Sequence, residues 1–261
     1  MTTWHSLYLR SDDPNAVAEH LRGVLTAFDY TLYDPFGTMP GAAYNQSVKL
    51  FVSPTDSGWV RVIGNVDSAL LSQISEVALC LSAEFDDNSA RVTVFEQGNP
   101  VTIDALTQFL RDGVTVEVLQ RSLIQPTTQP ATNDKDFPMD VLPDDLKDAA
   151  KDLNPKHINR MFGKLMKKVN RQLGGSTEGA RELLKSDGDW RSVGGQRLRA
   201  FMNGLTLPSH WHTPDFVALR DAYQLQRRKQ RNPNAPDYPG DAEAMQAVSN
   251  ALDYLPVYGG K

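Results

Sequence analysis

Two neighbouring histidines have the spacing in this sequence that most resembles a metal-binding site. His210 and His212 lie at alternate positions, and Asp215 follows three residues after the second. Alternate side chains of an extended segment point to the same side, so these groups together could bind zinc or iron. The competing interpretation is that Asp215 caps a helix containing Phe216 and that the histidines are ordinary loop residues. We favour the second and expect no metal and no cofactor, with a metal-dependent enzyme at His210 and His212 as an alternative.

Paired carboxylates suited to acid-base catalysis occur at Asp86-Asp87 and Asp144-Asp145. The first pair falls in an expected hairpin turn, where short polar side chains hydrogen-bond their own backbone. The second falls at an expected helix start, where negative charge meets the positive end of the helix dipole. The sequence contains no phosphate-binding loop, no nucleophile elbow and no C-x-x-C pair. We therefore expect binding rather than catalysis.

The single cysteine and the apolar runs indicate where the protein resides. Cys80 lies among Ala78, Leu79 and Leu81, which predicts a buried, unreactive thiol and excludes an intrachain disulfide. The run from Val77 to Leu81 is typical of the apolar stretches and is far too short to cross a bilayer. The first residues lack the basic lead and apolar stretch of a secretory signal. We expect a cytoplasmic protein without a membrane span.

Positive charge is concentrated in one part of the chain. Residues 155–231 hold sixteen Lys or Arg and six Asp or Glu, although the whole chain has 27 basic and 32 acidic residues. A helix through Lys164 would carry its basic residues nearly opposite an apolar stripe. A second basic cluster spans Gln226 to Arg231. The residues expected to bind a partner are Lys156, Arg160, Lys164, Lys167, Arg171, Arg227, Arg228 and Lys229.

Such a surface fits several acidic partners. We expect an acidic protein surface or the chain's own acidic amino-terminal domain, in the same subunit or in a second copy, since residues 1–133 hold seven basic and fifteen acidic residues. Nucleic acid is the alternative, with Lys164, Lys167, Arg171, Arg227 and Arg228 on phosphates, and with Trp190 and Trp211 stacking on bases if they are exposed. An anionic lipid surface or a merely solvated face also stays open.

A segment rich in proline and threonine suggests two domains. The length of 261 residues is enough for two cores, and residues 123–140 have the composition of a linker. We predict an acidic α+β domain over residues 1–122, with a mixed, mostly antiparallel sheet and two or three helices. Residues 141–261 are predicted to form a basic all-α domain.

Local patterns predict the elements of the amino-terminal domain. Strands are expected at His5–Leu9, Val48–Val52 and Trp59–Ile63, with a hairpin of Leu79–Phe85 and Arg91–Phe95 around Asp86–Ser89. Asp13-Pro14 is expected to start a helix, a second helix contains Leu70 to Val77, and Thr102–Arg111 is a third. Val114, Val116 and Val118 alternate like a closing strand.

Helical spacing dominates the carboxy-terminal part. Helices are expected around Leu142–Leu153, Ile158–Leu173, from Ser176, at Leu198–Leu205, Phe216–Leu225 and Ala242–Leu252. The loop Pro35–Gln46 is long for a compact domain, so it is either functional or mobile.

Overall fold

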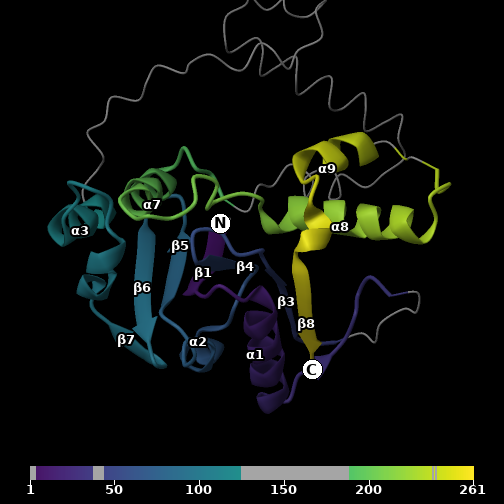
Figure 1. The fold of residues 1–261 in the computed structure, drawn as a ribbon, viewed down its shortest axis with the longest axis horizontal. Helices are drawn as coiled ribbons and strands as arrows, with labels where there is room; N and C mark the ends of the chain where they lie inside the picture. The colour runs from purple at the N-terminus through teal and green to yellow at the C-terminus, as the bar shows by residue number, and fades with distance from the viewer. Residues whose placement is uncertain (1–3, 38–43, 125–187, 237, 239) are drawn as a thin grey trace, which may run out of the picture. The chain divides into compact units, whose positions relative to one another are not determined.

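The computed structural model describes residues 4–37, 44–124, 188–236, 238 and 240–261 (Figure 1). The chain divides into one unit made of Met1–Thr127 with Ser186–Lys261, and a second unit, Thr128–Lys185, that lies outside the described residues. The first unit is an antiparallel sheet with helices packed against it, so the expected α+β class is confirmed for this part of the chain.

All pairs of neighbouring strands in the sheet are antiparallel. Their order is β2-β8-β3-β4-β1-β5-β6-β7, so strands from the start, middle and end of the chain lie side by side. The strands are β1 (Trp4–Arg10), β2 (Thr31–Leu32), β3 (Ser47–Val52), β4 (Trp59–Ile63), β5 (Cys80–Phe85), β6 (Ala90–Glu96), β7 (Asn99–Val101) and β8 (Leu255–Gly260).

Helices begin where the sequence supplies caps. Asp13 accepts hydrogen bonds from the backbone N–H groups of Asn15 and Ala16, and Pro14 occupies the first turn, as predicted. The described helices are α1 (Pro14–Ala27), α2 (Ser68–Ile74), α3 (Val116–Ile124), α7 (Val193–Asn203), α8 (Phe216–Arg231) and α9 (Asp241–Ala247), with 3-10 turns at Ile103–Phe109 and Ala251–Asp253. None of these helices is both long and apolar enough to span a bilayer.

Strand alternation gives the sheet two apolar faces. Leu7 and Leu9 point to the face covered by α1 and α2, where they join Leu21 and Leu70 in one core. Trp4 and Tyr8 point to the opposite face, where half of the sheet packs against α3 and α7. On the other half of that face a third cluster forms between the sheet and α8, and it includes Phe51, Ile63, Leu219 and Tyr223.

The expected all-α domain over residues 141–261 is not confirmed. Strand β8, near the carboxyl terminus, lies between β3 and β2, and its six residues pair with Ser47–Val52 (Figure 1). The segment LPVYGG gives little strand signal because proline and glycine are depleted in strands. Position 260 needs a glycine, because the Tyr44 ring occupies the space that the Cβ of any other residue would take.

Helix α3 corrects a second expectation. Val114, Val116 and Val118 were predicted to alternate as a strand, but Val116–Ile124 is helical. Leu119 is buried in the cluster with α7, and Leu123, four residues on, is partly buried beside it, which is helical spacing. The helix expected at Thr102–Arg111 is present as a 3-10 helix at Ile103–Phe109.

Several predictions are confirmed within the described residues. The strands at His5–Leu9, Val48–Val52 and Trp59–Ile63 are present, and β5 and β6 form the expected hairpin. Asp86 closes its turn, because Oδ1 accepts 2.8 Å hydrogen bonds from the N–H groups of Asn88 and Ser89. Helix α9 ends at Ala247, earlier than the expected Leu252, and a 3-10 turn follows. The helices expected between Leu142 and Leu184 lie outside the described residues.

Candidate ligand-binding cavity

The structure places His210, His212 and Asp215 in different surroundings. The Nε2 atom of His210 lies 3.7 Å from Oδ2 of Asp56. The Asp215 carboxylate instead accepts a 2.8 Å hydrogen bond from the N–H of Ala218, which confirms the helix-cap interpretation. Among the residues that the structure describes, no three His, Cys, Asp or Glu side chains gather where a metal ion would fit.

His212 lies among aromatic rings. Its ring centroid is 5.3 Å from that of Trp190 and 5.1 Å from that of Trp211. Burial lowers the pKa of His212, and the charges of Arg199 and Arg61 lower it further. His212 is therefore neutral at neutral pH and acts as a packing residue here.

The two tryptophans proposed for base stacking belong to a cluster of rings. Trp211 is buried and packs edge-on against Trp4 and Tyr8. Trp190 is partly buried, with its centroid 4.4 Å from that of Phe85. These contacts fill the space between the sheet and the segment before α8, so Trp211 is a core residue.

The expected partner-binding residues divide into two groups. Lys156, Arg160, Lys164, Lys167 and Arg171 lie outside the described residues. Arg227 and Arg228 lie near the carboxyl end of α8, Arg227 3.5 Å from Asp34 and Arg228 in an ion pair with Asp241. Lys229 is partly buried. The arginine cluster of α8 is thus largely engaged with the chain's own groups.

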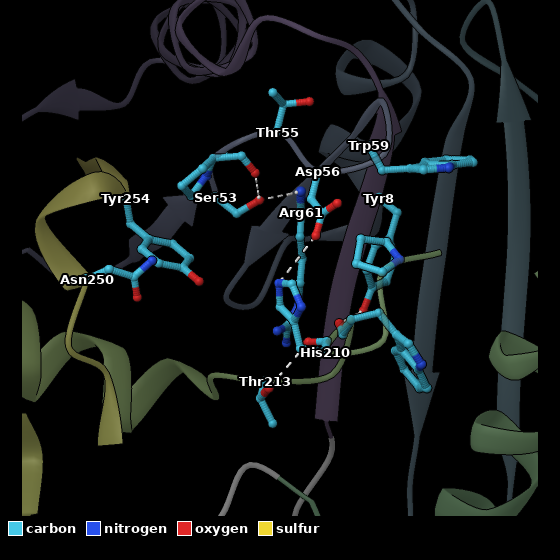
Figure 2. Close-up of a pocket in the computed structure, with 13 residues that line it drawn as sticks. Tyr8, Ser53, Thr55, Asp56, Trp59, Arg61, His210, Thr213, Asn250 and Tyr254 are labelled. Carbon is cyan, nitrogen blue, oxygen red and sulfur yellow. Dashed lines mark hydrogen bonds and ion pairs between the residues drawn. The ribbon is translucent and has the colours of Figure 1, made fainter. Parts of the chain in front are cut away.

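A cavity lies on the face of the sheet covered by α7 and α8. Its volume is about 230 Å³, and its walls come from strands, loops and the segment before β8 (Figure 2). The lining residues come from three distant parts of the chain: Tyr8, Ser53, Pro54, Thr55, Asp56, Trp59 and Arg61; then Pro208, His210, Trp211 and Thr213; then Asn250 and Tyr254.

Arg61 is the buried charge of this cavity. It lies on β4 between two apolar residues, Val60 and Val62, and is only 6% exposed. Its Nε donates a 3.0 Å hydrogen bond to Oγ of Ser6, and a terminal nitrogen donates a 2.9 Å hydrogen bond to the carbonyl oxygen of Pro214. These contacts fix the guanidinium, which also lies over the ring of Trp4. Burying a charge is costly, so a buried arginine usually has a structural or functional role. The position of Arg61 between apolar clusters therefore marks the cavity as a candidate site.

Two tyrosines flank Arg61, and Figure 2 shows the guanidinium side chain running between them. Tyr8 donates its hydroxyl hydrogen to the carbonyl oxygen of Trp211, and burial raises the pKa of Tyr8 to about 12. Burial also raises the pKa of Tyr254, with the charge of Arg61 opposing the rise. The Tyr254 hydroxyl has no hydrogen-bond partner among the described residues and is protonated at neutral pH, so it can donate to a ligand.

The rim of the cavity is polar. Ser53 Oγ accepts a 2.9 Å hydrogen bond from the Arg61 backbone and donates one of 2.7 Å to the carbonyl of Pro54. Asp56 and His210 face each other from two loops, with side chains 46% and 62% exposed. A contact between side chains this exposed contributes little to stability.

Comparisons with known proteins do not identify the site. No protein-family model matches the chain, and comparisons with curated proteins and with solved structures give no significant match. The cavity is therefore interpreted from its own geometry and chemistry.

The sequence pointed to only part of this cavity. His210 was singled out and does line it, but beside a carboxylate rather than beside a second ligand. Arg61 and Tyr254 were missed, because 193 residues separate them and only the sheet brings them together. One signal was present, since Arg61 interrupts the otherwise apolar strand WVRVI.

Proposed function

We propose that this chain is a binding protein that holds a small polar organic molecule in the cavity beside Arg61. The observation that carries the proposal is a cavity with mixed polar and apolar walls in which a buried guanidinium and the Tyr254 hydroxyl lie together. Ligand sites combine apolar surface with a few oriented polar groups, and this cavity has both, with a larger polar share. A volume of about 230 Å³ is below the roughly 300–1,000 Å³ of sites for drug-sized molecules, so the ligand is small.

Binding is favoured over catalysis by the way the lining groups are used. Ser53 and Tyr8 both donate their hydroxyl hydrogens to backbone carbonyls, and in the described part of the chain neither is hydrogen-bonded to a histidine or carboxylate that would activate it as a nucleophile. His210 pairs with Asp56 at the rim and has no hydroxyl partner among the described residues. The proposal retains a cytoplasmic location and needs no metal or cofactor.

A cavity-filling variant of the full chain tests this function. Asn250 lies at the exposed rim, and no described residue hydrogen-bonds its side chain, so Asn250→Trp fills the opening with little other change. Gln246→Trp places the same ring at an exposed position on α9 outside the cavity and is the matched control. In ligand-observed NMR against a library of small polar molecules, we expect compounds that bind the wild type and Gln246→Trp but lose binding to Asn250→Trp. A library with no such compound would contradict the proposal.

A second candidate function rests on the charge of the sequence. No acidic residue occurs between Asp152 and Glu178, a segment that includes Lys164, Lys167 and Arg171. We propose that this segment engages an acidic protein surface, with nucleic acid as the alternative partner. Fluorescence anisotropy of a labelled acidic peptide and of labelled duplex DNA, at low and physiological salt, separates the two. Reversing the three charges to Glu should abolish binding, and binding that survives the reversal would refute this role.

A further inference from the structure

We propose that the cavity ligand is a small monocarboxylate with a planar apolar body, an inference that rests on the proposed binding function. The class follows from three features of the cavity: one fixed guanidinium, one hydroxyl donor on the opposite wall and aromatic or proline surfaces between them. Each feature selects a different part of the ligand.

The guanidinium of Arg61 selects a planar oxyanion. Its position is fixed by hydrogen bonds from Nε to Ser6 and from a terminal nitrogen to the Pro214 carbonyl, so little side-chain entropy is lost on binding. It projects from β4, which lies between β3 and β1 and is therefore held on both sides. Its fixed positive charge favours an oxyanion over a neutral group, because charge-assisted hydrogen bonds are the stronger ones.

Tyr254 supplies a second donor from another part of the chain. Its residue is 6% exposed, yet its hydroxyl end points into the cavity toward Arg61 (Figure 2). The charge of Arg61 acts on the pKa of Tyr254, which places the two groups within electrostatic reach of each other. A carboxylate between them would accept hydrogen bonds from both sides.

The remaining walls select the body and the charge of the ligand. Pro54, Pro208 and the ring of Tyr254 present apolar surface, which suits a ring more than a sugar or a polar chain. Asp56 at the rim adds a negative charge, and no lysine lines the cavity among the described residues. Asp56 would repel a phosphate dianion, and a single guanidinium would neutralise only one of its two charges. A monoanion therefore fits better.

Benzoate and its neutral analogue benzamide are the probes that test this class. By isothermal titration of the full chain we expect benzoate to bind at least tenfold more tightly than benzamide. The variant Tyr254→Phe keeps the ring and removes the donor, and it should weaken benzoate binding about tenfold while changing benzamide binding less, because hydrogen bonds to charged groups are the stronger ones. Tyr238→Phe, an exposed tyrosine outside the cavity, is the matched control and should leave both affinities unchanged.

The possible failures are distinguishable. Equal binding of benzamide and benzoate would overturn the carboxylate class and leave the small-molecule function intact. If benzoate fails to bind but the library yields neutral compounds whose binding is lost in Asn250→Trp, the carboxylate class is also overturned. The small-molecule function again remains intact. If no compound of any class distinguishes Asn250→Trp from Gln246→Trp, both the ligand class and the proposed function are overturned.

Discussion

Gly194, in the first turn of α7, lies where this helix meets the β5–β6 hairpin. A Cβ added there would lie less than 3.0 Å from the carbonyl oxygens of Asp86 and Ser89, closer than Cβ atoms approach other atoms in proteins. The backbone N–H of Gly194 donates to the carbonyl oxygen of Asp87, at 3.4 Å. Because both obstructing atoms belong to the backbone, Gly194→Ala forces either the helix or the turn to move.

The expected loss of stability in Gly194→Ala is the difference between a steric cost and a gain in helix propensity. Overpacking a buried contact costs roughly 1–3 kcal/mol, and here the clash is severe enough to use the upper part of that range. Alanine regains up to about 1 kcal/mol of helix propensity relative to glycine, so the net loss is about 2 kcal/mol. Gly23→Ala is the matched control, since Gly23 lies in α1, is exposed and has no atom within 4 Å of the position that a Cβ would take.

Urea unfolding followed by tryptophan fluorescence measures the difference. All four tryptophans, Trp4, Trp59, Trp190 and Trp211, lie in the unit that contains the sheet. Gly194→Ala should lower the unfolding midpoint, whereas Gly23→Ala should raise the free energy of unfolding by about 0.5–1 kcal/mol. If Gly194→Ala were as stabilising as Gly23→Ala, α7 would not pack on the hairpin as described.

Three further predictions concern the sheet and its buried groups. Deleting Leu255–Lys261 removes β8 and leaves β3 without a partner on one side, so circular dichroism and fluorescence should show loss of cooperative unfolding; an unchanged transition would contradict the strand order. Burial raises the pKa of the Cys80 thiol to about 12, so Ellman's reagent at pH 8 should react with it only in denaturant, and rapid reaction of the folded chain would refute its burial. Burial lowers the pKa of His5, so below about pH 6.5 the unfolded chain binds more protons and the free energy of unfolding falls. The variant His5→Gln should show a smaller fall between pH 7.5 and pH 5 than the control His20→Gln on α1, and equal falls would contradict the desolvation of His5.

The sequence predicted the elements whose signals are local. Asp13-Pro14 starts α1, and Asp86 closes the hairpin, because each side chain bonds to backbone within three residues of itself. Strand β4 was predicted because WVRVI is apolar and rich in β-branched residues. The elements that failed had ambiguous or weak local signals. Val116 and Val118 fit a short strand as well as a helix, and β8 becomes a strand only through pairing with residues about 200 positions earlier.

The candidate site was predictable only in part for the same reason. A histidine pair is visible in sequence, and His210 does reach the cavity. The juxtaposition of Arg61 and Tyr254 depends on the course of the chain from β4 to the turn before β8, for which no local pattern exists. An arginine within a buried strand is nevertheless a signal that sequence reasoning can use, because a buried charge needs a partner or a purpose.

A crystal structure of the full chain with benzoate tests the central claim most directly. We predict electron density for one benzoate in the cavity, with its carboxylate oxygens within hydrogen-bond distance of the Tyr254 hydroxyl and the Arg61 guanidinium and its ring against the apolar surface of Pro54 and Pro208. A cavity that holds no benzoate at a saturating concentration, or a benzoate whose carboxylate points away from Arg61 into solvent, would contradict it.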